Sequence, residues 1–113
     1  MIEQMSREPL GNFELMVMLA VVQAGDEAYG IPIASEIEAA TGRKVLLGSI
    51  YAALERLEAK GLVTSSIGDP TPERGGRSKK YFRVTTKGLR ETRRMRQALT
   101  RLWRGIPATE GGV

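Results

Sequence analysis

The sequence lacks cysteine and histidine, and it has few aromatic residues: one tryptophan, two phenylalanines and three tyrosines. Without these two residue types there are no disulfides and no thiolate or imidazole metal sites. The commonest nucleophile–base and acid–base pairs of enzymes are excluded with them. No nucleotide-binding glycine motif and no carboxylate pair suited to acid–base chemistry is evident. We therefore expect a protein that is not an enzyme and that carries no metal or cofactor.

Long apolar runs are also missing. The longest, from Leu15 to Val22, falls short of the roughly 20 residues that a helix needs to cross a bilayer. The first residues, Met-Ile-Glu-Gln, lack the basic start and the cleavage site of a signal peptide. We expect a cytoplasmic protein with no membrane partner, built as one domain with a modest core.

The formal net charge of +4 hides a strong asymmetry along the chain. Residues 1–73 carry 5 basic and 11 acidic side chains, whereas residues 74–104 carry 12 basic side chains and a single acidic one, Glu91. Such segregation indicates a surface in the last third that faces a polyanion. Charge counting leaves open that the arginines of this third are simply solvated.

Hydrophobic spacing predicts the first two helices. Residues 1–9 show no period and are expected to form a flexible arm. The stretch 10–24 predicts a helix that is apolar almost all round, which needs cover on several sides, and a second subunit is the expected cover. A second helix opens at Tyr29-Gly30-Ile31-Pro32 and ends at Thr41-Gly42.

The stretch Gly48–Gly61 organises the rest of the sequence. Ile50, Leu54 and Leu57 recur at i, i+4 and i+7, which predicts a helix with one buried stripe, and Gly61 provides a left-handed stop. The opposite face is expected to carry small and cationic side chains: Ser49, Ala52, Ala53, Arg56 and Lys60.

Two strands and a last helix follow. Residues 62–67 and 81–85 have strand character, and the Gly/Pro-rich loop between them is too long for a tight turn. Thr85 is a suitable N-cap for a helix over residues 86–104. Its apolar side chains follow a helical stripe or lie beside it: Leu89, Met95, Leu99, Leu102, Trp103 and Ile106.

These elements predict a mainly α (α+β) fold, a winged helix-turn-helix with a two-stranded β wing and a C-terminal dimerisation helix. We expect the DNA-binding domain to span residues 10–85, the dimerisation helix 86–106 and a flexible tail 107–113. In this geometry the third helix enters the major groove of DNA, and the wing loop reaches the neighbouring backbone or minor groove.

Residues of the recognition helix suit distinct DNA contacts. Ser49 and Tyr51 can hydrogen-bond phosphates, whereas Ala52 and Ala53 can touch thymine methyl groups. Arg56 can reach a guanine edge or a phosphate. Two alternatives stay open: a half-buried packing role for Tyr51, and an ion pair between Arg56 and a glutamate.

The wing and the last helix add further candidates. Arg77 and Lys79 are expected to contact phosphates, with Lys80 beside them on the strand; the alternative is a solvated loop. Trp103 suits the anchor of a dimer interface. A second role for Trp103 is stacking on a flat effector between subunits.

Four blocks of the sequence resemble the PadR family of bacterial winged-helix transcriptional regulators. They are Leu10–Leu15, Tyr29-Gly30 with Ile37, the helix and its exit from Gly48 to Val63, and the wing with its second strand from Gly76 to Thr85. The sequence departs from the family where Ala52 and Ser78 stand at positions that often hold proline.

The resemblance implies a homodimeric repressor that binds a pseudopalindromic operator and is often released by a small phenolic or drug-like effector. It implies a dimer formed by the first and last helices, which adds Phe13 and Met16 to the apolar residues of the last helix, and we add Tyr29 to the DNA contacts. Two other classes remain open. One is a winged-helix protein-interaction module, and the other is a non-specific nucleic-acid binder.

Overall fold

The computed structural model describes residues 10–68 and 78–107, so the predictions for the arm at 1–9, for Arg77 and for tail residues 108–113 lie outside it. The helices are α2 (Asn12–Ala24), α3 (Gly30–Thr41), α4 (Leu47–Ala59) and α5 (Thr86–Trp103). A 3-10 turn, η1 (Gly25–Glu27), follows α2, and the strands are β1 (Val63–Ile67) and β2 (Lys80–Val84). Each element lies where the sequence predicted it, with bounds shifted by a residue or two.

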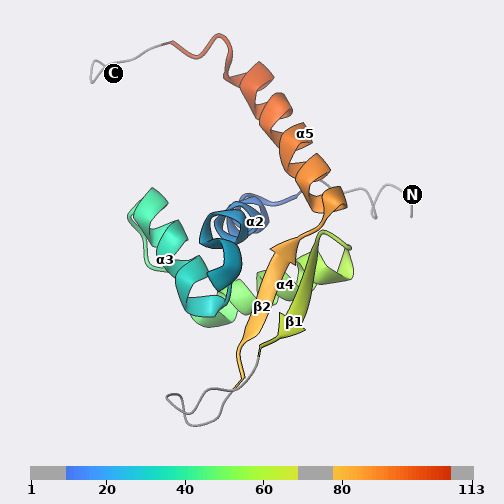
Figure 1. Ribbon diagram of the computed structural model, residues 1–113. Helices are drawn as coiled ribbons and strands as arrows, with labels where there is room; N and C mark the ends of the chain where they lie inside the picture. Colours follow the sequence, from blue (N-terminus) through green and yellow to red (C-terminus); the bar gives the residue numbers. More distant parts are fainter. Residues whose placement is uncertain (1–9, 69–77, 108–113) are drawn as a thin grey trace.

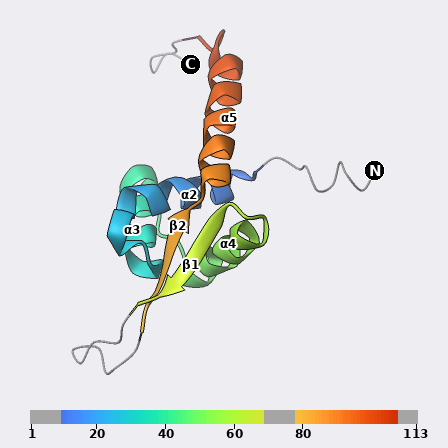
Figure 2. The same cartoon turned by 45° about the vertical axis from the view of Figure 1, so that its right-hand side comes forward.

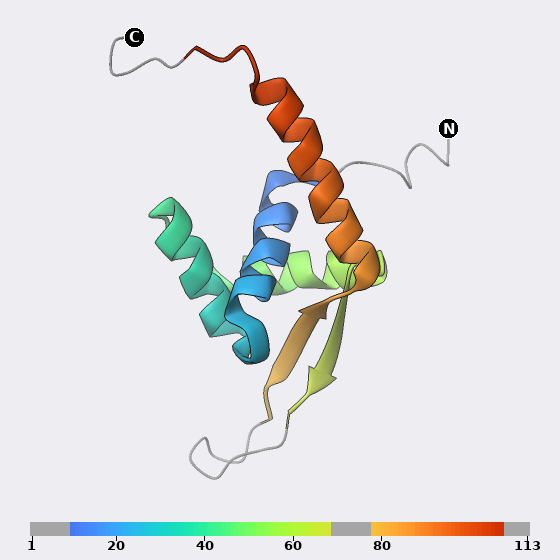
Figure 3. The ribbon, with the colours of Figure 1, turned by 45° about the horizontal axis from the view of Figure 1, so that its top comes forward.

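The core lies where α2, α3 and α4 meet, and α2 occupies the position between α3 and α5 (Figures 1 and 3). The predicted stripe of α4, Ile50, Leu54 and Leu57, is fully buried. Burial of these three side chains contributes about 1.5–3 kcal/mol each to folding. The helix is therefore held from one side, and its opposite side faces solvent.

The hairpin is attached to the helices along β2. The Phe82 N–H donates a hydrogen bond of 2.8 Å to the Ala28 carbonyl, just after η1, while β1 pairs with the other edge of β2. The Phe82 side chain is buried in the core, opposite Ser65 in the strand register. The sheet therefore projects from a fixed base, as a wing should.

The start of α5 is bonded to the end of α4. The Thr85 side-chain oxygen accepts a hydrogen bond from the Gly88 N–H at 3.0 Å, which confirms the predicted N-cap, and its hydroxyl donates to the Gly61 carbonyl at 2.7 Å. Lys87 Nζ donates to the Lys60 carbonyl at 2.9 Å. Gly61 has φ +77°, the left-handed conformation expected of the helix stop.

Beyond this junction α5 extends away from the domain, and the hairpin points in the opposite direction (Figure 2). Gly88 is its single buried residue, and Met95 packs partly against the core. Leu102 and Trp103 are 74% and 70% exposed. Most of the apolar surface of α5 is thus uncovered within one subunit.

Gly88 makes the close approach of α5 to the hairpin possible. A Cβ at this position would collide with the Leu62 carbonyl oxygen and lie 2.7 Å from Val84 Cγ1. Gly88→Ala should therefore lower the free energy of unfolding by about 1–3 kcal/mol, measured by urea denaturation followed by circular dichroism.

Gly48→Ala is the matched control, because nothing lies within 4 Å of a Cβ built there in α4. That change should raise stability by up to about 1 kcal/mol through helix propensity. Equal stabilisation by both substitutions would show that the α5 junction is not tightly packed.

Candidate nucleic-acid interface

The outer face of α4 is narrower than the sequence suggested. Ser49, Ala52 and Arg56 are exposed, but Ala53 is fully buried in the core. Ala53 follows Ile50 by three residues and precedes Leu57 by four, which places all three on one side of a helix. The prediction that Ala53 contacts thymine was wrong, whereas Ser49 and Ala52 stay candidates.

Tyr51 packs at the start of α3. A Cβ added to Gly30 would lie 2.8 Å from the Tyr51 Cζ atom, so the ring covers a site that only glycine leaves open. The side chain still exposes 40% of its surface. The ring of Tyr51 is thus a packing residue, which is the alternative that the sequence left open. Contact between the Tyr51 hydroxyl and a phosphate stays a prediction.

Glu14 of α2 forms ion pairs with two cations at the end of α4. Arg56 Nε lies 2.8 Å from Glu14 Oε2, and Lys60 Nζ lies 3.2 Å from Glu14 Oε1. Glu14 is only 8% exposed. Arg56 therefore pairs with a glutamate through Nε, the alternative left open by the sequence, while its side chain stays 54% exposed.

Glu14 was not singled out from the sequence, although it is the one charged residue within the apolar helix α2. Burial would raise the pKa of its carboxyl, but hydrogen bonds from Arg56 and Lys60 and the charge of Lys60 outweigh burial and hold the pKa below its ordinary value. A lowered carboxyl pKa stabilises the fold above the pKa of the unfolded chain. That contribution is lost as the pH falls through the folded pKa.

Glu14→Gln tests this ion pair. At pH 7 the substitution should lower the free energy of unfolding by about 1–2 kcal/mol, because two cations lose their charged partner. The difference from wild type should shrink as the pH falls below about 4.3, the ordinary pKa of a glutamate in the unfolded chain, because unfolding then takes up a proton that the folded carboxyl resists. Urea titrations of both proteins at pH 7 and pH 3.5 measure this difference in the free energy of unfolding.

Glu36→Gln, an exposed carboxyl on α3, is the control and should leave stability nearly unchanged at both pH values. A penalty for Glu14→Gln that is the same at pH 7 and pH 3.5 would contradict an electrostatic role.

The base of the wing concentrates aromatic rings and cations. Lys79 Nζ lies 3.7 Å above the Tyr29 ring, and the Tyr29 and Tyr81 rings meet edge to face with centroids 5.5 Å apart. Lys80 is exposed, with its Nζ 5.7 Å from the Phe82 ring centroid. Tyr29 thus positions Lys79 beside the start of α3, where both can meet a phosphate backbone.

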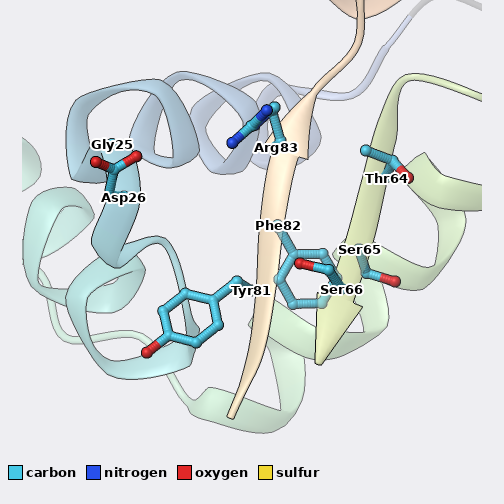
Figure 4. Close-up of a pocket in the computed structure, with 8 residues that line it drawn as sticks. All are labelled: Gly25, Asp26, Thr64, Ser65, Ser66, Tyr81, Phe82 and Arg83. Atoms are coloured by element: carbon cyan, nitrogen blue, oxygen red, sulfur yellow. The ribbon is translucent and has the colours of Figure 1, made fainter. Parts of the chain in front are cut away.

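The outward face of the hairpin has an open hollow of about 460 Å³ (Figure 4). Asp26 lies on one side of it, Tyr81 and Arg83 extend from β2, and the hydroxyls of Thr64 and Ser66 come from β1. Arg83 is a cation that the sequence prediction missed. Strand alternation could have found it, because its neighbour Phe82 points into the core.

The residues predicted to form a dimer interface come from α2 and from α5 with the segment after it. Phe13, Met16 and Met95 are partly buried, and Leu99 and Ile106 are 40% and 60% exposed. A groove of about 340 Å³ opens where α5 leaves α2, lined by Leu15, Thr92, Arg96, Leu99, Thr100 and Trp103. Leu89 is 37% exposed and lies outside this groove.

Over residues 10–68 and 78–107, no group of three or more acidic side chains is arranged to hold a metal ion. Within the same residues, no helix combines the length and apolar character needed to span a membrane.

The arrangement of three helices, a buried stripe on α4 and a projecting hairpin defines a winged helix-turn-helix protein. Residues 18–94 match the model of the transcriptional regulator PadR-like family. The chain therefore belongs to the PadR-like family of transcriptional regulators. Among curated proteins, none matches it.

Solved structures agree with this fold. A PadR family transcriptional regulator from Eggerthella lenta is 27% identical, with a TM-score of 0.65 over 93% of this chain and 84% of its own. A transcriptional regulator from Clostridium thermocellum is 22% identical, with a TM-score of 0.67 over 82% and 87%. The complex structure of hsRosR-S1 is 26% identical, with a TM-score of 0.61 over 84% and 78%.

Proposed function

We propose that this protein is a homodimeric repressor that binds a pseudopalindromic operator through α4 and the wing. The observation that carries the proposal is the uncovered face of α4, which lies beside a wing base that holds Lys79 over Tyr29. In helix-turn-helix proteins such a face enters the major groove, and nearby cations contact phosphates. Residues 10–85 form the DNA-binding part in this proposal.

Pairing of two copies rests on α5, within residues 86–106. Leu102, Trp103 and Ile106 each expose at least 60% of their surface. On α2, Leu19 and Val22 add exposed apolar area, 46% each. Apolar surface of this extent is stabilised by burial against a partner, and a second copy supplies the same surface in a self-complementary way.

A small aromatic effector would bind in the groove between α2 and α5. The groove is apolar along Leu15 and Leu99, and Trp103 offers a flat ring for stacking. An effector bound there would lie against both α5 and α2, the helix that carries Glu14. It could thereby change the spacing of the two α4 helices and release the operator.

DNA binding is tested with a palindrome from the protein's own promoter region and with scrambled DNA of equal length, by fluorescence anisotropy over a salt series. The palindrome should bind at least tenfold more tightly. Lys79→Gln should weaken binding to both DNAs and reduce the slope of log affinity against log salt by about one.

Arg101→Gln is the matched control, because this exposed cation lies near the far end of α5. It should leave the slope unchanged. Equal wild-type affinity for both DNAs would support a non-specific nucleic-acid binder instead, and no binding to either would support a protein-interaction module.

A further inference from the structure

The outer face of α4 has few groups that can recognise a base by hydrogen bonding. Near its start the exposed residues are mostly small, namely Gly48, Ser49 and Ala52, with Leu47 and Tyr51 each 40% exposed. Arg56, toward the end of the helix, donates through Nε to Glu14, which restrains its guanidinium. At the start of the helix, direct recognition of the sequence therefore includes van der Waals contact, and the one apolar group that bases present in the major groove is the thymine methyl.

Leu46 supplies an apolar side chain at the start of this helix. It occupies the N-cap position of α4 and is 78% exposed, more than any other large hydrophobic residue among those described. Its carbonyl accepts hydrogen bonds from the Ser49 N–H at 3.0 Å and the Ile50 N–H at 3.2 Å. The backbone at Leu46 is therefore fixed while its side chain extends into solvent.

The charges around Leu46 favour DNA as its partner. Lys44 is exposed two residues earlier in the chain. Tyr51 in the first turns of α4 packs on Gly30, whose neighbour Tyr29 carries Lys79 over its ring. An apolar side chain with a cation two residues away suits a groove edged by phosphates. The start of α4 is the end of that helix remote from α5 (Figure 3).

We propose that Leu46 is a specificity-determining residue that contacts the 5-methyl group of a thymine in each half-site. The N-terminal residues of a recognition helix are those that meet base edges, which is where Leu46 stands. Ala52, one and a half turns into the helix, adds a smaller contact. This inference rests on the proposed function, because it requires an operator.

The test replaces thymines of the operator, one symmetric pair at a time, with deoxyuridine, which removes the methyl group and keeps every hydrogen-bonding group. Wild-type protein should bind one of these operators roughly fourfold more weakly per lost methyl contact, about 16-fold for the symmetric pair, and the other substitutions should have little effect. Leu46→Ala should bind the thymine and deoxyuridine forms of that operator equally.

Ile31→Ala is the control, because Ile31 is also a largely exposed apolar residue, 61%, but lies on α3. This variant should keep the wild-type preference for thymine. Thermal melting of both variants should match wild type, since neither side chain belongs to the core.

The outcomes separate the two proposals. If wild type prefers the palindrome but tolerates every deoxyuridine, the methyl contact is refuted and the proposed function stands. If Leu46→Ala still discriminates thymine from deoxyuridine, the contact belongs to another residue, and the role of Leu46 is refuted. If wild type does not prefer the palindrome over scrambled DNA, the proposed function fails and the inference fails with it.

Discussion

Burial of one face of α4 is the constraint on which the rest of the structure depends. Ile50, Leu54 and Leu57 are completely removed from solvent, so the helix cannot rotate about its axis without exposing its stripe. Glu14 adds a second restraint by pairing with Arg56 and Lys60 toward the end of the same helix. The face that remains outside is therefore presented in a fixed orientation, which is what a binding surface requires.

The surface around α4 and the wing base differs in chemical character from the surface of α5. Around α4 and the wing base the exposed groups include small, aromatic and cationic side chains as well as Leu46, and Lys79 is held against Tyr29. Along α5 the apolar side chains Leu102 and Trp103 remain exposed. The bonds from Thr85 and Lys87 fix the start of α5 to the end of α4, so these two helices keep a fixed relative position.

The sequence predicted the fold because each element has a local signal. The 3.6-residue spacing of apolar side chains marked the buried stripe of α4. Thr85, whose side-chain oxygen caps the helix, marked the start of α5. The errors in the site arise from contacts that local patterns do not contain. Glu14 and Arg56 are 42 residues apart in the chain. Ala53 is the exception, because its spacing from Ile50 and Leu57 already placed it on the buried side. Leu46 lies before the first residue of the helical pattern, so the spacing of apolar residues did not indicate its exposure.

The central claim is that α5 joins two copies so that two α4 helices meet one face of DNA. Hydroxyl-radical footprinting of the wild-type protein on its operator tests it most directly. Two protected half-sites with centres about 10–10.5 base pairs apart, or a multiple of this spacing, are the predicted result. A single protected half-site, or uniform protection without a centre of symmetry, would contradict the claim.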